Sequence, residues 1–337
     1  MTPGPQIRVG ITLGDVNGIG PEVALKAVYT RRWATGVRFL LIGAADLAMA
    51  EARRLGLPAP RVVDDPAAPS TGRCGVWTPP GVIPVRNPGC VRADAGRAAA
   101  DWIRAAVGAA LRGEVDALVT APICKESLKA AGVPEPGHTE MLARLTRTRR
   151  FAMLLVGGGL RVVLATRHLP LRDVPGALSR RGLLDTIRLT AEAMPWLGLP
   201  DGVIGVCGLN PHAGDGGALG DEESLIIAPA LRAARRAGLR VAGPVPADTI
   251  FHQALQGRYA AVVAMYHDQG LGPLKMLGFE TGVNVTLGLP IVRTSPDHGT
   301  AFDLAGQGRA NPSSMREAIR LALALAARPN PWAGARA

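Results

Sequence analysis

Aromatic residues and long apolar runs are scarce in this chain of 337 residues, and each shortage excludes a class of protein. Aromatic side chains make up 4% of the sequence, which leaves few surfaces on which nucleic-acid bases could stack. Hydrophobic residues reach 47%, yet no uninterrupted apolar run attains the roughly 18 to 20 residues that a membrane span needs. The N-terminus also lacks the basic and apolar segments that mark a secretory signal. We therefore expect a cytoplasmic protein that does not associate with membranes.

Cysteine is rare, and acidic residues are in the minority. The four cysteines (Cys74, Cys90, Cys124 and Cys207) form no C-x-x-C pair, so we expect reduced thiols rather than disulfides or zinc fingers. The net charge of +11 could indicate a nucleic-acid partner, because clustered Lys and Arg release counterions from a phosphate backbone. The densest cluster, RLTRTRR, is short. We expect no nucleic-acid partner, since an anionic small substrate explains the sign of the charge equally well.

What the sequence does contain is an alternation of short apolar runs with helical patterns, which predicts an α/β fold. The strand-like runs lack polar alternation, so we expect strands that are covered on both faces. They lie at residues 7–13, 37–44, 115–122, 151–158, 160–168, 202–210 and 259–267. The helical patterns lie at residues 21–29, 45–56, 94–114, 180–197, 222–237 and 313–327. A chain of this length usually divides into two lobes, and the absence of a linker predicts that they are interleaved.

Three of the six histidines, His168, His212 and His267, come at the ends of strand-like runs. Ligands of open α/β sheets bind outside the carboxyl ends of the strands. Neutral imidazoles from separate elements, with coordination positions left open, describe a catalytic divalent-metal site better than a structural one. Asp248 and Asp268 are candidate carboxylate partners of these histidines, although a turn or capping role is equally open.

The stretch YAAVVAMYHDQGLGPLK, at residues 259–275, passes directly from a strand-like run into His267. We expect the strand to end there because His267 has to leave the sheet to reach a cation. Gly270 and Gly272 are expected to let the chain bend back towards Lys275.

Glycine-rich and polar segments supply further candidate ligand groups. TLGDVNGIGPEV, at residues 12–23, does not follow the G-x-G-x-x-G order, so we reject a Rossmann fingerprint; a structural turn and a ligand loop are both open. Anion-binding candidates are Lys275, Asn284, Arg293, and His138 with Thr139 in GHTE at the start of a helix. Each of these has a surface or capping role as an equal alternative.

Taken together, a series of longer motifs resembles the PdxA family, the 4-hydroxythreonine-4-phosphate dehydrogenases of vitamin B6 biosynthesis. The resemblance runs from about residue 7 to about residue 325 and rests on GDVNGIGPE, GHTE, ATRHLPLRDV, CGLNPHAGDGG, GPVPADTIF, AMYHDQGLGPLK, GVNVTLGLPIVRTSPDHGTA and FDLAGQG. One departure is visible, because Val16 and Asn17 stand where the family commonly has Pro and Ala.

The resemblance implies a two-lobed α/β/α fold of the isocitrate and isopropylmalate dehydrogenase type, with the active site between the lobes of each subunit of a homodimer. We expect residues 1–118 and 277–337 to form the lobe with the dinucleotide-binding loop. Residues 119–276 are expected to form the second lobe, with the metal-ligand histidines and the dimer contacts.

The resemblance also assigns residues. Metal ligands are His168, His212 and His267, the last supplied by the partner subunit, around one divalent Zn, Mg or Co ion. The substrate-binding residues are His138, Thr139, Lys275, Asn284 and Arg293. By similarity to the wider fold, the dinucleotide is held by His298, Gly299, Thr300, Ala301, Asp303 and Asn311. Because a carboxylate at Asp303 would accept hydrogen bonds from ribose hydroxyls but repel a 2′-phosphate, NAD is expected over NADP.

The implied reaction is the NAD-dependent oxidation of 4-phosphohydroxy-L-threonine to 2-amino-3-oxo-4-phosphooxybutanoate. That product decarboxylates to 3-amino-2-oxopropyl phosphate, a precursor of pyridoxal phosphate. Asp248 and Lys275 are the candidate proton acceptors. The alternative substrates are another phosphorylated hydroxy acid, such as 4-phospho-D-threonate or D-erythronate, or a dihydrodiol dicarboxylate. A basic nucleic-acid-binding protein that retains an old enzyme fold is the alternative from another class.

Overall fold

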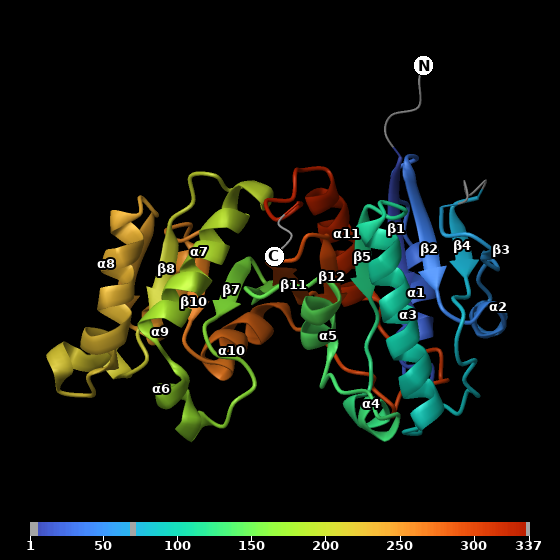
Figure 1. Ribbon diagram of the computed structural model, residues 1–337, viewed down its shortest axis with the longest axis horizontal. Helices are drawn as coiled ribbons and strands as arrows, with labels where there is room; N and C mark the ends of the chain where they lie inside the picture. Colours follow the sequence, from blue (N-terminus) through green and yellow to red (C-terminus); the bar gives the residue numbers. More distant parts are fainter. Residues whose placement is uncertain (1–5, 68–71, 335–337) are drawn as a thin grey trace, which may run out of the picture. The chain divides into compact units, whose positions relative to one another are not determined.

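The computed structural model describes residues 6–67 and 72–334. The chain divides into two compact units, and Figure 1 labels most of their helices and strands. Unit 1 comprises the residues up to 148 and from 289 onward, and unit 2 comprises residues 149–288. The first division differs from the expected one after residue 118 because two helices that follow this point pack on unit 1. The second differs from the expected one after residue 276 because a strand at 283–287 pairs within unit 2.

Unit 1 is built on a parallel sheet with the strand order β3-β4-β2-β1-β5-β12. Its strands are β1 (Ile7–Thr12), β2 (Val37–Ile42), β3 (Arg61–Val63), β4 (Cys74–Trp77), β5 (Ala117–Thr120) and β12 (Arg293–Pro296). Its helices are α1 (Gly20–Tyr29), α2 (Ala45–Arg54), α3 (Ala93–Leu111), α4 (Lys125–Ala130), α5 (His138–Leu145) and α11 (Ser313–Ala326). Both α3 and α11 contact β1 and β5. All of β5 is buried, which confirms for this central strand the prediction of cover on both faces.

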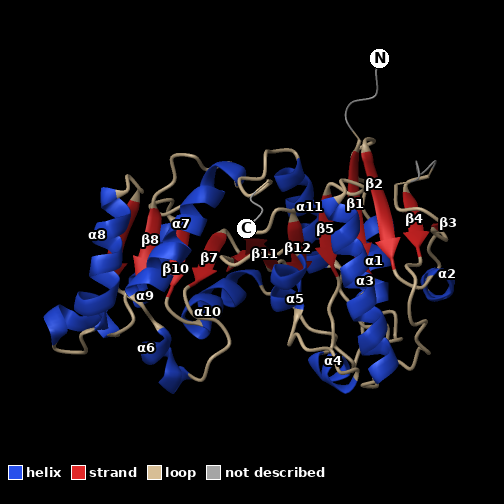
Figure 2. Cartoon of the chain, in the orientation of Figure 1, coloured by secondary structure: helices blue, strands red, loops and turns tan. Residues whose placement is uncertain are grey.

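Unit 2 is built on a mixed sheet with the strand order β11-β6-β7-β10-β8-β9; β7, β8, β10 and β11 are labelled in Figure 2. Its strands are β6 (Ala152–Gly157), β7 (Leu160–Leu164), β8 (Ile204–Cys207), β9 (Val241–Val245), β10 (Ala261–Ala264) and β11 (Val283–Leu287). β6 runs antiparallel to β7 and β11, whereas β7, β10, β8 and β9 are mutually parallel. The helices are η1 (Leu171–Asp173), α6 (Val174–Ala177), α7 (Arg180–Trp196), η2 (Pro211–Gly217), η3 (Glu223–Ile227), α8 (Ala228–Arg236), α9 (Ala247–Leu255) and α10 (His267–Gly278).

The segment after β10 corrects one expectation from the sequence. Gly270 and Gly272 do not bend the chain back, because both lie inside helix α10. A Cβ added at Gly270 would lie 2.6 Å from Val162 Cγ1 and 3.0 Å from Ala264 Cβ. Glycine is therefore needed there to bring α10 close to β7 and β10. The helix was missed because glycine and proline are poor helix formers in isolation.

Two expectations about the environment of the chain can be compared with the structure. All four cysteines are free, as predicted from their spacing. Among the helices of the described residues, none combines the length and the apolar composition needed to cross a membrane.

Close contact between α3 and α4 provides a stability test. A Cβ added at Gly96 of α3 would lie 2.1 Å from Ser127 O, a main-chain atom of α4 that cannot swing away. We expect Gly96→Ala to lower the free energy of unfolding in urea by about 2 to 3 kcal/mol through overpacking. The matched control is Gly108→Ala in the same helix, where the nearest atom is Arg112 Nη1 at the end of a flexible side chain, 3.2 Å away. This control should be neutral or stabilising by up to about 1 kcal/mol; equal effects of the two substitutions would contradict the packing argument.

Candidate active site

Three histidines follow the carboxyl ends of neighbouring parallel strands in unit 2. β7, β10 and β8 lie side by side and run parallel. His168 comes after β7, His212 comes after β8, and His267 opens α10 directly after β10. Carboxyl ends of parallel strands meet at one edge of a sheet, which is where α/β proteins bind their ligands. The predicted placement of the histidines at one end of three strands is confirmed.

Two of these imidazoles are close together and one is oriented by a carboxylate. The ring centroids of His168 and His267 lie 5.4 Å apart, and His267 Nδ1 forms a hydrogen bond of 2.7 Å with Asp268 Oδ1. When the carboxylate accepts, Nδ1 carries the proton and Nε2 keeps its lone pair for a metal ion. Within residues 6–67 and 72–334 no three His, Cys, Asp or Glu side chains converge on one ion position. One chain alone therefore does not assemble the predicted set with His212.

Buried hydrogen bonds tie the three strand ends to one another. The Thr166 hydroxyl, beyond β7, donates to Met265 O at 2.7 Å. Gln269 Oε1 accepts a hydrogen bond of 2.7 Å from the N–H of Met265, and Gln269 Nε2 donates to Gly208 O, beyond β8, at 2.8 Å. Gln269 is only 9% exposed, so these bonds are protected from water. They fix the main chain from which each of the three histidines projects.

The loop that carries His212 has an unusual backbone. Residues 212–216 all have φ between 43° and 84°, including the non-glycine residues His212, Ala213 and Asp215. The left-handed conformation costs an L-residue roughly 1 to 2 kcal/mol, so neighbouring groups must stabilise it. Glu223, which is 6% exposed, accepts hydrogen bonds from the main-chain N–H groups of Leu209 and Asn210 at 2.7 and 2.8 Å. Its second oxygen accepts one from Asn210 Nδ2 at 2.9 Å. This carboxylate therefore holds the loop in place.

The remaining predicted residues of unit 2 are distributed over three elements. Asp248 is exposed in the first turn of α9. Within the part of the chain that the structure describes, no hydrogen bond joins it to the three histidines. Lys275 is half-buried on α10, with Nζ 5.7 Å from the centroid of the Phe279 ring. Asn284 lies on β11, where its Oδ1 is buried and no described residue donates a hydrogen bond to it. Asn284 thus retains an acceptor for a ligand.

In unit 1, a buried arginine lies at the start of β12. Arg293 is 1% exposed, and its Nε and Nη2 donate to the Thr120 hydroxyl at 3.2 and 2.7 Å. Burial lowers the pKa of Arg293 to about 9, since desolvation penalises its charge. Thr120 ends β5, so this group also lies at the carboxyl end of a strand. An anion bound here would stabilise the charged guanidinium.

His138 and Thr139 open α5, as predicted from GHTE. Thr139 is buried, and no described residue hydrogen-bonds to the buried Nε2 of His138. Burial first, and then the charge of Arg293, lower the pKa of His138 well below its ordinary value. His138 is therefore a neutral imidazole at pH 7. It lies close enough to Arg293 for the guanidinium charge to disfavour protonation of the ring.

Thr120 was missed in the sequence because nothing local distinguishes it from any threonine that ends a strand.

The predicted dinucleotide loop begins with His298, whose Nδ1 lies 3.0 Å from Gly299 O. Beside Gly299 the space is open, with no atom within 4 Å of an added Cβ. Ala301 has φ 41°, a strained conformation of the kind that clusters at ligand sites. Thr300 O accepts a hydrogen bond of 2.9 Å from the N–H of Ile19, in the turn before α1. The turn before α1 therefore holds this loop at Thr300.

A buried ion pair anchors the end of the same loop. Glu22, 1% exposed, accepts from Lys26 Nζ at 2.7 Å and from the N–H of Ala310 at 2.8 Å. Lys26 Nζ also donates to Gly308 O and Ala310 O at 2.8 and 3.0 Å. The loop is thereby fixed to α1.

Asp303 and Asn311 are exposed on this anchored loop. Asn311 Oδ1 accepts hydrogen bonds from the N–H and the hydroxyl of Ser313 at 3.0 and 2.7 Å. That oxygen therefore shapes the start of α11, and the amide nitrogen is the part of Asn311 that remains for a ligand.

Asn17, a departure from the family pattern, has a structural role of its own. Its Oδ1 accepts from the N–H of Asn87 at 2.7 Å, and its Nδ2 donates to Cys90 O at 3.0 Å. A Cβ on Gly89 would come within 3.2 Å of Phe302 O, so this segment contacts the dinucleotide loop. Alanine at position 17 could make neither bond, so the stabilisation of residues 87–90 by this side chain depends on Asn17.

A comparison with protein families identifies a match over most of the chain. The family model described as pyridoxal phosphate biosynthetic protein PdxA matches residues 37–322. Among curated relatives, 4-hydroxythreonine-4-phosphate dehydrogenase of Desulfosudis oleivorans is 47% identical over 334 residues, which cover 96% of this chain and 97% of the relative. D-threonate 4-phosphate dehydrogenase of Pectobacterium atrosepticum is 41% identical over 333 residues, covering 94% of this chain and 99% of the relative.

A comparison with solved structures gives a consistent result. The crystal structure of 4-hydroxythreonine-4-phosphate dehydrogenase from Klebsiella pneumoniae has a TM-score of 0.84 and 42% sequence identity, and the match covers 95% of this chain and 100% of that one.

The buried imidazole of His138 predicts a specific pH dependence. Because the folded protein disfavours its protonation, the unfolded chain takes up the proton first as the pH falls below 6.5, and stability decreases. At about pH 5.5 this one group should lower the free energy of unfolding by on the order of 1 kcal/mol relative to neutral pH. We expect His138→Gln to reduce the loss of unfolding free energy between about pH 7.5 and about pH 5.5 by that amount in urea denaturation. Identical pH dependence in the variant and the wild type would contradict a neutral, buried His138.

Proposed function

Since the chain belongs to the PdxA family of pyridoxal phosphate biosynthetic proteins, we propose that it is a 4-hydroxythreonine-4-phosphate dehydrogenase, an oxidoreductase of vitamin B6 biosynthesis. The observation that carries this proposal is 47% identity, over 96% of the chain, to a relative of that name. The substrate is 4-phosphohydroxy-L-threonine, whose secondary alcohol is oxidised to 2-amino-3-oxo-4-phosphooxybutanoate. This β-keto acid then loses carbon dioxide to give 3-amino-2-oxopropyl phosphate.

The proposed metal ligands are His168 and His212, with His267 from the partner subunit, around one zinc, magnesium or cobalt ion. A bound divalent ion lowers the pKa of a coordinated alcohol and polarises a carbonyl oxygen. Asp268 keeps the proton of His267 on Nδ1, which leaves Nε2 in the state that a ligating imidazole requires. The hydrogen bonds of Gln269 and Glu223 hold the strand ends and the His212 loop before any ligand binds, so little reorganisation is needed.

The proposed substrate-binding residues are His138, Thr139 and Arg293 in unit 1 and Lys275 and Asn284 in unit 2. Arg293 supports an anionic substrate, because an anion bound beside it would stabilise its buried charge. His138 is neutral, so its ring can hydrogen-bond to the substrate without adding charge. Binding energy from these groups would orient the alcohol for hydride transfer.

The proton of the substrate alcohol is proposed to pass to Asp248 or Lys275. Lys275 lies on α10, the helix that His267 opens, and is half-buried. Asp248 is exposed at the start of α9. A lysine acts as a base only in its neutral form.

We propose NAD rather than NADP as the hydride acceptor, held by the loop of His298, Gly299, Thr300 and Ala301 together with Asp303 and Asn311. Bound NAD would accept the hydride released from the alcohol. The exposed carboxylate of Asp303 can accept hydrogen bonds from ribose hydroxyls and would repel a 2′-phosphate. The anchoring of this loop by Glu22 and Lys26 keeps its main chain in one conformation.

A homodimer is proposed because the family resemblance assigns His267 to the site of a second subunit. Unit 2 also exposes large apolar side chains where the helix that His267 opens comes to its end: Met276 and Phe279 are 83% and 76% exposed, and apolar groups gathered on a surface indicate an interface. We also propose a cytoplasmic location, which suits four free cysteines.

The second candidate substrate is 4-phospho-D-threonate, with the same chemistry. It is favoured by the 41% identity to a D-threonate 4-phosphate dehydrogenase over 94% of the chain. D-erythronate 4-phosphate and dihydrodiol dicarboxylates complete the set of analogues to be compared.

Turnover with a panel of these substrates tests the proposal. With NAD and a divalent metal, 4-phosphohydroxy-L-threonine should give NADH with the highest kcat/KM of the panel, and a chelator should abolish the signal until the metal is restored. A higher kcat/KM for 4-phospho-D-threonate would transfer the assignment to that substrate. NADH formation that persists in excess chelator would contradict the metal requirement.

A matched pair of histidine variants tests the metal ligands. We expect His212→Ala to lower kcat/KM at least about 100-fold, since losing a metal ligand should cost no less than losing a group that orients one. The control is His252→Ala, an exposed histidine of α9 whose ring contacts Gln256, and this variant should keep its activity. Equal activity of the two variants would exclude His212 from the site.

A further inference from the structure

The side chain of Arg293 runs along the sheet of unit 1 towards the carboxyl ends of the strands. Arg293 is paired with Leu118 in the register of β12 and β5, yet its guanidinium reaches Thr120, two residues further along β5. Alternate residues of a strand lie on the same face, about 7 Å apart, so the extended arginine spans this distance on one face. The guanidinium is therefore directed to the end of the sheet where α/β proteins bind ligands.

The Thr120 hydroxyl fixes one edge of this guanidinium. Its oxygen accepts hydrogen bonds from Arg293 Nη2 at 2.7 Å and from Arg293 Nε at 3.2 Å. A hydroxyl has two acceptor lone pairs, and a guanidinium is a planar group with its donors in a rigid fork. Two bonds from one edge to a single oxygen therefore set the plane of the guanidinium as well as its position. They also direct Nη1 away from this hydroxyl.

Both partners of this contact are buried. Thr120 is 0% exposed and Arg293 is 1% exposed, so solvent cannot take the place of the hydroxyl. Hydrogen bonds that involve a charged group are stronger than those between neutral groups. Loss of the hydroxyl would therefore leave the guanidinium without an acceptor on this edge, and its orientation would change.

The main chain that carries Thr120 is held by the glycine-rich turn after β1. Thr120 pairs with Thr12 in the register of β5 and β1, and the N–H of Asp15 donates to Pro122 O at 2.9 Å. Gly14 has φ 68°, and a Cβ there would lie 2.2 Å from Pro122 O, so only glycine allows this close approach. The hydroxyl of Thr120 thus projects from a strand end that is fixed by its neighbours.

We propose that Thr120 is a positioning residue for the substrate, because its hydroxyl holds the Arg293 guanidinium in the orientation that binds an anionic group of the substrate. This inference rests on the proposed substrate-binding role of Arg293. Thr120 acts through the arginine and does not contact the anion itself. A guanidinium that is already oriented binds its partner with a smaller cost of ordering.

Calorimetric titration of the metal-loaded chain with O-phospho-L-homoserine tests this role. The probe has the carboxylate and the phosphate of the proposed substrate but no alcohol at the carbon to be oxidised, so binding is measured without turnover. Thr120→Val replaces the hydroxyl by a methyl group of similar size and should weaken the probe about tenfold. Thr120→Ser keeps the hydroxyl and should bind the probe as the wild type does. Unchanged affinity in Thr120→Val would overturn the proposal.

The matched control is Thr294→Val on β12. Thr294 is also 0% exposed, and its hydroxyl donates to Ala318 O at 2.8 Å. The same substitution there removes a buried hydrogen bond one residue away from Arg293. It should lower the free energy of unfolding but leave the affinity for the probe unchanged. An equal loss of affinity in Thr294→Val and Thr120→Val would indicate a general fault in packing and would count against the proposal.

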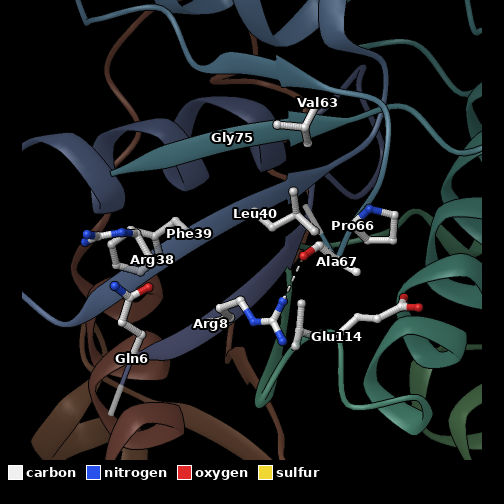
Figure 3. A pocket seen from close by; sticks show the side chains of 11 residues that line it. Gln6, Arg8, Arg38, Phe39, Leu40, Val63, Pro66, Ala67, Gly75 and Glu114 are labelled. Carbon is white, nitrogen blue, oxygen red and sulfur yellow. Dashed lines mark hydrogen bonds between the residues drawn. The ribbon is translucent and has the colours of Figure 1, made fainter. Parts of the chain in front are cut away.

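A double-mutant cycle shows whether Thr120 acts through the arginine. Arg293→Gln should weaken the probe at least as much as Thr120→Val, and adding Thr120→Val to Arg293→Gln should have little further effect. Additive effects of the two substitutions would contradict the proposal. Arg8→Gln is the charge control, since Arg8 lies near the start of β1 and donates to Ala67 O at 3.4 Å (Figure 3); it should leave the affinity unchanged.

Steady-state kinetics separate this proposal from the proposed reaction. Thr120→Val should raise KM for 4-phosphohydroxy-L-threonine about tenfold while KM for NAD stays at the wild-type value, because Glu22 and Lys26 hold the dinucleotide loop independently. A rise in both KM values would indicate a structural fault. Absence of turnover in the wild type would count against the proposed reaction, whereas the probe titrations would still decide the role of Thr120.

A second pair of variants covers the case in which valine impairs folding. Thr120→Ala and Thr120→Ser both lack the methyl group of threonine and differ from each other only by the hydroxyl. The alanine variant should bind the probe more weakly than the serine variant. Equal affinities of the two would show that the hydroxyl does not position Arg293, and the proposal would fail.

Discussion

The buried amide of Gln269 is the interaction on which the geometry of unit 2 depends. It joins the end of β10 to the end of β8, through hydrogen bonds to Met265 and Gly208, while Thr166 joins β7 to β10. Without the bonds of Gln269, the N–H of Met265 and the carbonyl of Gly208 would lose these buried partners, which is costly. The histidines therefore project from a hydrogen-bonded edge rather than from independent loops, and α10 starts where that edge requires it.

In both units, a loop with left-handed backbone residues is held by a buried glutamate. The left-handed residues around His212 are stabilised by the buried carboxylate of Glu223. In unit 1, the left-handed Ala301 lies in a loop that Glu22 and Lys26 hold at its far end. Each candidate ligand loop thus has a conformation that its own residues disfavour and a buried glutamate that fixes it. Such preorganisation is what binding sites require, because it removes the cost of ordering at the moment of binding.

The sequence alone was sufficient to predict those features that depend on neighbouring residues in the chain. The α/β alternation, the strand-end placement of the histidines, the helix that begins at His138 and the free cysteines could all be read from short patterns. Helix α10 could not be read in this way. Gly270 is needed there for close packing against Val162, which is visible only in the fold. Glu223 and Gln269 were missed for a similar reason, since their partners lie far away in the chain. Asn17 was noticed only as a departure, and its bonds to residues 87–90 needed the fold.

The central claim is that the strand ends of unit 2 present imidazoles to one divalent metal ion. Anomalous diffraction at the cobalt edge, from crystals of the cobalt-loaded protein, tests it most directly. The account predicts one strong peak per subunit, within bonding distance of His168 and His212 of one chain and His267 of another. A cobalt peak remote from these residues, or bound by only one of them, would contradict it.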